Sequence, residues 1–436
     1  MEIGAWAEWD PLTDVMIHRP GIEMFFGLLE PYSFLYERTF SMDGAVYEHE
    51  ALEHALVEEG IRVHRLKRTM VDRAREEPAL VERARESAPR LLRYDGPGPL
   101  VRRARRALRA NLARFDAESL FNVLLLHPSA LLAERGGTRN DHPRVSLDLP
   151  LANLYFLRDQ QALTHRGLIQ ARMAKPQRRP EPELTRAILE LAGGRFIGQI
   201  RPPGTFEGGD FLPAGSFALL GTGDRTDAAA VRQILGLGLE HEEIAVVHQP
   251  AHPLIPGNAP DPMVDMHLDT HLNLAGDHLA VGLIPLLKRA RTEIYRRRSK
   301  GRFVREPTTT NVYDYLKRRG FDLVPLTTLE QLSYASNFLT LSDRRILAIE
   351  VERVIPRVLA TVAASALAQP GRYGALHRQA LRDAAELKSS DAFFPHKPEL
   401  SQAGVEIHPV LLEEITGGYG GAHCMTAALH RRRPGS

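Results

Sequence analysis

The chain has 436 residues, of which 43% are hydrophobic and 25% charged, as is usual for a folded globular protein. Its 56 basic and 54 acidic side chains give a formal net charge of +2, which excludes a strong overall field for attracting nucleic acid or an anionic membrane. The single cysteine excludes an internal disulfide, and no apolar run reaches the roughly 18 residues of a membrane-spanning helix. Because the first residues lack the pattern of a signal peptide, we expect a cytoplasmic protein.

The first third of the chain predicts one α/β unit followed by helices. Residues 15–21 are typical of a short strand stopped by a Pro-Gly turn, and residues 45–59 have the apolar spacing of a helix that ends at Gly60. Residues 61–66 alternate apolar and polar side chains, as a strand does. From residue 71 to about 132, apolar residues at helical spacing among many arginines and glutamates predict several helices with little strand. We interpret the arginine run at 102–109 as a solvated helix face.

From Leu151 onward, a unit of strand, polar turn and second strand recurs at intervals of roughly 55 to 70 residues. The four copies cover residues 153–166, 209–225, 265–283 and 337–349. Helices are predicted between them at 181–192, 227–235, 308–319 and 356–368, with strands at 244–247 and 322–326. With the N-terminal unit and the C-terminal segment beside it, this repeat predicts an α/β fold of five ββαβ modules in a closed propeller with an α-helical insertion. The expected division is residues 1–70 for the first module, 71–140 for the insertion and 141–436 for the remaining modules.

The only cysteine lies near the C-terminus in the stretch Gly417-Gly418-Tyr419-Gly420-Gly421-Ala422-His423-Cys424-Met425-Thr426. A lone cysteine is commonly a small buried hydrophobe, because only a thiolate in a polar setting is reactive. The four glycines let the backbone bend closely around a small site. Together with the adjacent histidine and the polar motifs upstream, they favour a nucleophilic Cys424 presented by a loop.

Three upstream motifs contain clustered polar residues. In Asn153-Leu-Tyr-Phe-Leu-Arg-Asp159, alternation along a strand would place Asn153 and Asp159 on one face, although Asp159 is equally typical of a turn. In Glu207-Gly-Gly-Asp210, two carboxylates flank glycines that let the backbone approach a polar ligand; a simple turn is the alternative.

The third motif is Met266-His267-Leu268-Asp269-Thr270-His271. On a strand, His267, Asp269 and His271 would share one face, which suits either a metal site or a structural histidine cluster. The absence of a second cysteine and of a helical His pair argues against the metal.

In this order, Asn-Leu-Tyr-Phe-x-Arg-Asp, Glu-Gly-Gly-Asp, His-Leu-Asp-Thr and Gly-Gly-x-His-Cys-Met-Thr resemble the motifs of the arginine deiminases, in the guanidine-modifying or pentein superfamily. The resemblance runs from about Trp9 to Arg431. It implies a cysteine-dependent hydrolase that converts L-arginine to L-citrulline and ammonia through a covalent amidino-thioether, with no metal or organic cofactor. The implied partner is a small guanidino substrate, and a homo-oligomer remains open.

The same resemblance implies a role for each site residue. Cys424 would be the nucleophile, His267 the general acid/base and Glu207 its partner. Asp159 and Asp269 would grip the guanidinium, and Phe156 would lie against it. The amino-acid end of the substrate would meet Asn153, Arg178 (or its neighbour Arg179) and Arg225, with Asp210 alongside. These types suit the chemistry, because paired carboxylates bind a planar guanidinium bidentately and a cationic substrate favours a thiolate.

The chain departs from the family pattern at Tyr419, where deiminases commonly have an arginine five residues before the cysteine. A phenol donates one hydrogen bond and brings no charge, so recognition of the substrate carboxylate is expected to differ. The adjacent His423-Cys424 pair also resembles the amidinotransferase branch, in which an amine replaces water as the acceptor. A protein that binds guanidino ligands without turnover is the third alternative, and it would be marked by a missing catalytic residue.

Overall fold

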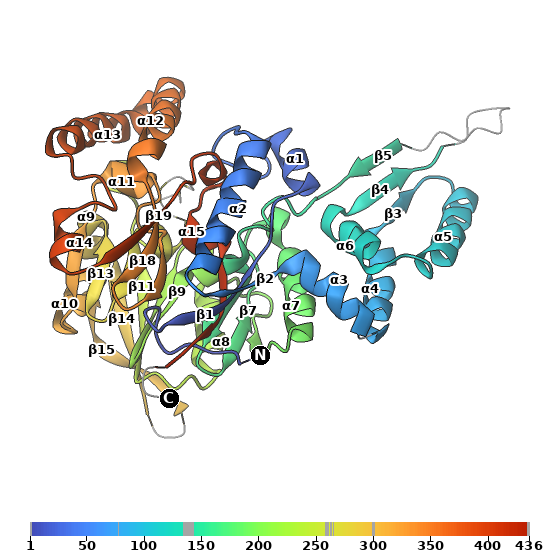
Figure 1. Cartoon of the computed structure of the whole chain (residues 1–436), viewed down its shortest axis with the longest axis horizontal. Coiled ribbons are helices and arrows are strands. Elements are labelled where there is room, and N and C mark those ends of the chain that lie inside the picture. Colours follow the sequence, from blue (N-terminus) through green and yellow to red (C-terminus); the bar gives the residue numbers. More distant parts are fainter. Residues whose placement is uncertain are drawn as a thin grey trace.

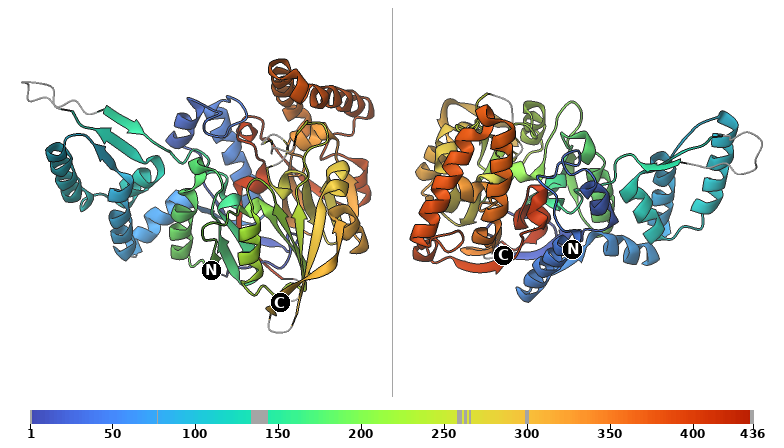
Figure 2. Two further views of the ribbon diagram at one scale, coloured as in Figure 1. Left: turned by 180° about the vertical axis from the view of Figure 1, so that it is seen from behind. Right: turned by 90° about the horizontal axis from the view of Figure 1, so that it is seen from above.

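The computed structural model describes residues 2–76, 78–133, 144–257, 261, 264, 266–298 and 301–433. These residues form a mixed α/β fold with six sheets. Figure 1 shows a body of strands surrounded by helices, with a smaller group of helices and strands at its side. The two further views in Figure 2 show the same separation, so the smaller group projects from the body.

Five sheets contain the same strand order. In the example that follows Leu151, β6 (Gln161–Thr164) and β7 (Gly167–Gln170) form an antiparallel hairpin, and β8 (Phe196–Gln199) returns parallel to β7 after helix α7 (Glu181–Leu191). The equivalent strands elsewhere are β9 (Phe211–Ala214), β10 (Phe217–Thr222) and β11 (Glu243–His248); β12 (Leu272–Gly276), β13 (Leu279–Gly282) and β16 (Asp322–Pro325); β17 (Leu339–Ser342), β18 (Arg345–Ile349) and β19 (Glu406–Val410). The expected strand-turn-strand repeat is therefore confirmed, although each hairpin begins later than the polar motif in front of it.

The two ends of the chain build the fifth of these sheets. Strand β20 (Ala427–Arg431) pairs antiparallel with β1 (Leu12–Ile17), which pairs in parallel with β2 (Arg62–Arg65). Between β1 and β2 lie helices α1 (Ile22–Leu28) and α2 (Met42–Glu58). Helix α2 ends where predicted, because Gly60 adopts a φ of 73° that a residue without a Cβ accepts at low cost.

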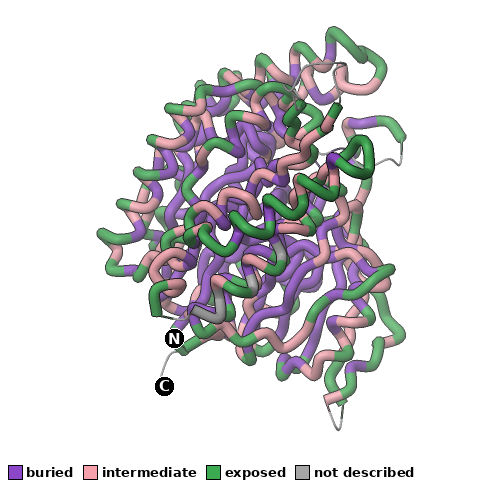
Figure 3. The backbone as a smooth tube through the Cα atoms, turned by 90° about the vertical axis from the view of Figure 1, so that its right-hand side faces the viewer, coloured by how far each residue is buried: buried purple, intermediate pink, exposed green. Residues whose placement is uncertain are grey.

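Helices connect and cover the remaining sheets. Their bounds are α8 (Ala228–Leu235), α9 (Ile284–Arg289), α10 (Val312–Arg318), α11 (Thr328–Leu332), α12 (Val351–Ala368), α13 (Pro370–Ser390), α14 (Pro398–Gln402) and α15 (Ala422–Met425). Figure 3 shows buried strands inside and exposed turns of helix outside. None of the helices among the described residues is long and apolar enough to cross a membrane.

The prediction of a helix over 308–319 was wrong in its first part. Strands β14 (Arg291–Arg297) and β15 (Phe303–Asn311) form a hairpin that extends the sheet of β9, β10 and β11, so the backbone up to Asn311 is in a β ladder. The helix begins only at Val312, where the Asn311 side chain accepts a hydrogen bond from the amide of Asp314.

The insertion contains the expected helices together with strands that were not predicted. Its helices are α3 (Leu66–Glu76), α4 (Pro78–Leu91), α5 (Gly98–Leu112) and α6 (Ala117–Leu126). Strands β3 (Arg93–Asp95), β4 (Pro128–Leu131) and β5 (Arg144–Leu147) add a sheet. None of these strand residues is buried, which explains why they lack the alternating pattern of a half-buried strand. The expected boundary at residue 140 lies outside the described residues.

Candidate active site

The polar motifs lie in the turns that precede the first strand of each hairpin. Asp159 lies in a 3₁₀ turn before β6, Glu207 directly before the turn that leads into β9, and Asp269 in the turn before β12. Asn337 precedes β17, and Cys424 lies in the short helix before β20. Five equivalent turns thus bring together residues as far apart in the sequence as Asp159 and Cys424.

The interpretation of this segment as a strand with Asn153 and Asp159 on one face was wrong, and the alternative of a turn at Asp159 is confirmed. The amide of Phe156 donates to the carbonyl of Asn153, and residues 157–160 form a 3₁₀ helix. The side-chain amide of Gln160 donates to the carbonyls of Leu154 and Phe156. Those carbonyls are therefore satisfied without a neighbouring strand, which lets the segment turn.

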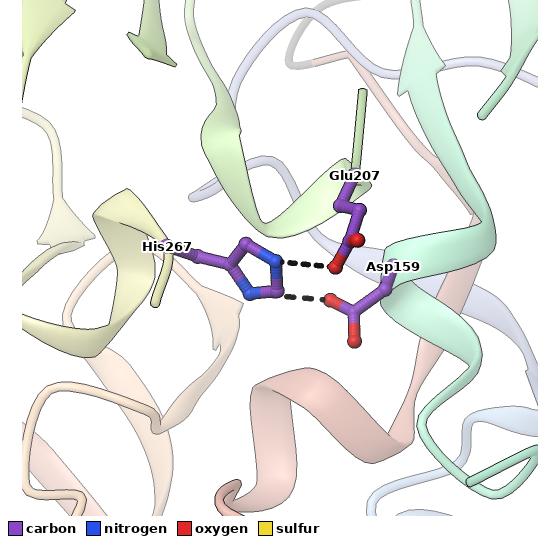
Figure 4. A group of neighbouring side chains, drawn as sticks. All are labelled: Asp159, Glu207 and His267. Atoms are coloured by element: carbon purple, nitrogen blue, oxygen red, sulfur yellow. Dashed lines mark hydrogen bonds and ion pairs between the residues drawn. The ribbon is translucent and has the colours of Figure 1, made fainter. Parts of the chain in front are cut away.

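His267 is the centre of a buried charged group (Figure 4). Its Nε2 lies 2.8 Å from Oε2 of Glu207, and its Nδ1 lies 3.6 Å from Oδ1 of Asp159. Burial alone lowers the pKa of His267, but the carboxylates of Asp159 and Glu207 outweigh it and raise this pKa to about 9. The imidazole is therefore protonated at neutral pH and can act as an acid.

The ligand atoms of Asp159, Glu207 and His267 lie within 4.8 Å of one another, so these residues could also hold a cation. The protonated His267 argues against this, because only a neutral imidazole binds a metal. The predicted face of His267, Asp269 and His271 does not exist: residues 268–270 form a 3₁₀ turn, and His271 is outside the group. Burial lowers the pKa of His271 to about 4, which leaves it a neutral core residue.

Cys424 is buried in helix α15, so the expectation of a loop was wrong. The side chain of Asn337 donates to Sγ of Cys424 at 3.1 Å, and its Oδ1 accepts from the amides of Gly421 and Cys424. One side chain therefore fixes both ends of the nucleophile turn. Burial, and after it the carboxylates of Asp269 and Asp159, raise the pKa of the Cys424 thiol well above its usual range.

Asp269 connects the sulfur with a second histidine. Its Oδ2 lies 3.7 Å from Sγ of Cys424 and 2.8 Å from Nδ1 of His423. Burial raises the pKa of Asp269, but the hydrogen bond and charge of His423, together with the charges of His267 and Arg158, outweigh it and lower that pKa. On the far side, Nε2 of His423 lies 3.6 Å from Oε2 of Glu8, which also pairs with Arg158. The carboxylate beside the nucleophile is thereby held ionised and oriented.

Gly209 allows the two carboxylate turns to approach each other. A Cβ at this position would lie 2.9 Å from Nδ1 of His267 and 3.0 Å from Oδ1 of Asp269. Real side chains do not tolerate such contacts, so the Glu-Gly-Gly-Asp motif is required for the close approach of its neighbours. The close approach at Gly209 is to the side chains of His267 and Asp269; an approach of this backbone to a polar ligand stays a prediction.

The residues expected at the amino-acid end of the substrate have protein partners. Nη1 of Arg178 lies 2.7 Å from Oδ2 of Asp159, and Arg178 also pairs with Glu181. Nη1 of Arg225 lies 3.4 Å from Glu207. The neighbour Arg179 is exposed, so of the two alternatives Arg178 is the one inside.

The other two polar positions are also engaged. The amide of Asn153 donates to the carbonyl of Phe34 at 2.7 Å. Asp210 accepts from the amide of Leu268 and from the hydroxyl of Thr226, so it anchors the turn behind Asp269. Burial raises the pKa of Asp210 to about 6. In this structure both residues position neighbouring turns.

A cavity of about 690 Å³ lies beside this group, lined in part by Phe34, Lys175 and Arg225. The ring of Phe156 lies against Gly420 of the nucleophile turn. Tyr419 has a φ of 71°, in the left-handed region. Burial, and then the carboxylate of Glu37, raise the pKa of Tyr419 above its usual range, so it is a neutral phenol.

Sequence reasoning missed Asn337 and Glu181 as members of this group. The repeat contained the signal for Asn337, because it opens the copy at 337–349 at the place where the other copies have their acidic or histidine motif. Glu181 gave no comparable signal, since its place at the first turn of α7 is also where helices commonly have an acidic residue.

Comparisons with known proteins agree with this geometry. The sequence model of the family described as arginine deiminase matches residues 32–431. An arginine deiminase of Halobacterium salinarum is 28% identical over 421 residues, which cover 79% of this chain and 85% of that protein. An arginine deiminase of Listeria welshimeri is 24% identical over 303 residues, and the matched part covers 65% of this chain and 62% of that protein.

Two solved structures share the fold. The amidinotransferase SxtG of Microseira wollei, from a saxitoxin biosynthetic pathway, superposes with a TM-score of 0.51 at 14% identity over 99% of this chain and 98% of that one. The N-terminal domain of ArgZ, an arginine dihydrolase of cyanobacteria, gives a TM-score of 0.50 at 13% identity over 95% and 97% of the two chains. At these identities the likeness is one of fold.

Proposed function

The chain belongs to the arginine deiminase family and is an enzyme acting on amidine C–N bonds, and on this premise we propose that it hydrolyses L-arginine to L-citrulline and ammonia. Cys424 is the nucleophile, His267 the general acid/base, and Asp159 and Asp269 bind the guanidinium. The position of all four side chains around one buried point supports these roles.

The observation that carries the proposal is a set of unsatisfied atoms beside the sulfur. Oδ1 of Asp159, Oδ1 of Asp269 and Nδ1 of His267 are buried and have no hydrogen-bond partner among the described residues. Buried polar atoms are normally paired, so these three mark a place built for a polar ligand. A guanidinium offers N–H donors in one plane to the two carboxylate oxygens, which suits this set.

The reaction follows from the charges of these residues. The thiol is protonated in the free enzyme, and a bound guanidinium cation lowers its pKa and releases the thiolate. Sγ then attacks the central carbon to give a tetrahedral adduct. The protonated His267 donates to the departing nitrogen, and ammonia leaves behind a covalent amidino-thioether. The neutral His267 next removes a proton from water, whose attack releases citrulline and the thiolate.

The amino-acid end of arginine would extend from this point toward the cavity of about 690 Å³. Asn153, Phe156, Arg178, Arg225 and Asp210 remain our candidates around it. Because Arg178 and Arg225 already pair with carboxylates, we expect the substrate to exchange partners with them as it binds. Tyr419 supplies a neutral hydrogen-bond donor in place of the family's arginine.

We also propose that the five equivalent sheets form a closed propeller around this site. The order of their contacts supports this, because β20 contacts β6, β9 contacts β12, β12 contacts β17 and β17 contacts β1, and the turn before β9 contacts β6. On this view residues 1–70 form the first module, 71–140 the insertion and 141–436 the remaining modules.

The test is to incubate the protein with arginine, with and without glycine as an amine acceptor, and to identify the products. Citrulline and ammonia in equal amounts, unaffected by glycine, would support hydrolysis. Ornithine with a new guanidino product would overturn it in favour of transfer. The mass of the denatured protein trapped during turnover would test the mechanism, because an amidino adduct must lie on the single cysteine.

A further inference from the structure

The helical insertion contains a strongly basic cavity that the proposed reaction does not use. It has a volume of about 580 Å³ and lies between the end of α4, strand β3 and helix α5. Figure 1 shows these three elements within the insertion. Its polar lining consists of Arg90, Arg93, Tyr94, Asp95, Arg105 and Arg109. Four guanidinium groups from three elements therefore face one hollow, with a single carboxylate among them.

Few acidic groups lie near these arginines. Among the residues that the structure describes, Arg90, Arg105 and Arg109 have no ion pair, and Arg93 reaches only Asp148 at 3.4 Å. Some arginines on other helices are paired four residues along, as in Arg68 with Asp72 at 2.7 Å and Arg186 with Glu190 at 2.8 Å. Here three arginines without an ion pair among the described residues line the same cavity.

The sequence concentrates this charge locally. Between residues 78 and 115 there are ten arginines and three acidic residues, whereas the whole chain is almost neutral. Helix α5 has no acidic residue, and its arginines at 102 and 106, and at 105 and 109, are four apart. Like charges at this spacing destabilise a helix. A solvated helix face explains their exposure, but it does not explain why arginines of α4 and β3 converge on those of α5.

We propose that this cavity binds a small molecule with a chain of two or more phosphate groups, such as a nucleoside triphosphate. Guanidinium groups bind phosphate oxygens bidentately, and the local excess of positive charge requires a ligand with several negative charges. The volume lies within the range of small-molecule sites. The half-buried ring of Tyr94 in the lining can stack on a base. This proposal is independent of the proposed function.

The test is a calorimetric titration of the full chain with inorganic tripolyphosphate and with adenosine triphosphate, in about 0.15 M salt so that weak surface attraction is screened. We expect saturable one-to-one binding of at least one probe. The double variant Arg105→Ala/Arg109→Ala should weaken it at least tenfold. The matched control Arg102→Ala/Arg106→Ala removes the same charge from the same helix, outside the lining, and should change it less than twofold.

Arg90→Ala, on a different element, repeats the test if the double variant is unstable. Tighter binding of adenosine triphosphate than of tripolyphosphate, lost in Tyr94→Leu, would support contact with the base; equal binding would support recognition of the phosphate chain alone. The proposal is overturned if neither probe binds saturably, if both double variants weaken binding equally, or if only single-stranded RNA binds.

Discussion

The catalytic group and the helical insertion contain similar side chains in opposite environments. Around His267, carboxylates and arginines are buried, and nearly every charge has an opposite charge within 4 Å. On helix α5, arginines are exposed and have like charges as neighbours. Burial strengthens each interaction in the first region, whereas water screens each in the second.

The difference in burial shows where in this molecule charged groups can shift the pKa of a reacting side chain. In the buried group, burial and neighbouring carboxylates raise the pKa of the Cys424 thiol, so the sulfur is protonated in the free enzyme. Neighbouring carboxylates also raise the pKa of His267, so its imidazole has a proton to donate at neutral pH. On the proposed mechanism, a cationic ligand changes that balance. On the insertion, the same kind of charge lies in water and contributes a local positive field.

The largest effect is expected from Cys424→Ser. A hydroxyl in this buried position is not ionised by a bound cation, so we expect kcat to fall at least about 10⁴-fold. Arginine should still bind in a calorimetric titration, because Asp159 and Asp269 are intact. Turnover within about a hundredfold of the parent would contradict the covalent mechanism.

Stability should depend on pH through His267. Its pKa of about 9 in the folded protein exceeds the ordinary 6.5, so the protonated ring stabilises the fold fully below pH 6.5 and loses this effect as pH rises through 9. The shift corresponds to about 3 kcal/mol. Urea unfolding of the parent and of His267→Gln at pH 6, 8 and 10 measures it. A difference between the two proteins that stays constant with pH would show that the ring is neutral.

Gly209→Ala tests the close packing inside without changing any charge. The added Cβ would meet His267 and Asp269 at 2.9 and 3.0 Å, so these groups must shift, and we expect kcat/KM to fall about 10²-fold. Gly371→Ala, where an added Cβ meets nothing within 4 Å in helix α13, is the matched control and should leave activity unchanged. Equal effects of both substitutions on kcat/KM would mean that the close approach of His267 and Asp269 to Gly209 does not matter for activity.

Much of this architecture could be predicted, because each signal is local. Hairpins after the polar motifs, the stop of α2 at Gly60 and the helices of the insertion follow from periodicity and turn residues. The resemblance of the four motifs to those of the deiminases also singled out Asp159, Glu207, His267 and Asp269, which lie together in the buried group, but it did not single out Asn337, which bonds the sulfur.

The wrong predictions share a physical cause. A correct prediction would have required knowing which atom forms a hydrogen bond with each backbone N–H and C=O group. The segment ending at Asp159 looked like a strand because its pairing with the Gln160 side chain cannot be seen in the alternation of residues. Strands β3 to β5 gave no signal, because neither face is buried. The partners of Arg178 and Arg225 depend on distances between turns that no local pattern contains.

Tyr419→Arg should sharpen recognition at the edge of the site. A guanidinium there could pair with the carboxylate of arginine, so we expect KM for arginine to fall roughly tenfold with kcat little changed. Agmatine has the same guanidinium but no carboxylate, and its KM should not improve. If both substrates improve equally, Tyr419 does not face the carboxylate end.

The smallest effect is expected on α5, from Arg102→Glu. A glutamate at this position lies three and four residues before Arg105 and Arg106 and near the helix start, so repulsion becomes attraction on one helix face. We expect the free energy of unfolding to rise by about 0.5 kcal/mol, with less effect at 1 M salt. Arg102→Gln removes the repulsion between residue 102 and Arg106 without adding an attraction. It should therefore raise the free energy of unfolding by about half as much. A cost of several kcal/mol would mean that α5 contains a buried charge network like that around His267, and the contrast between the two regions would fail.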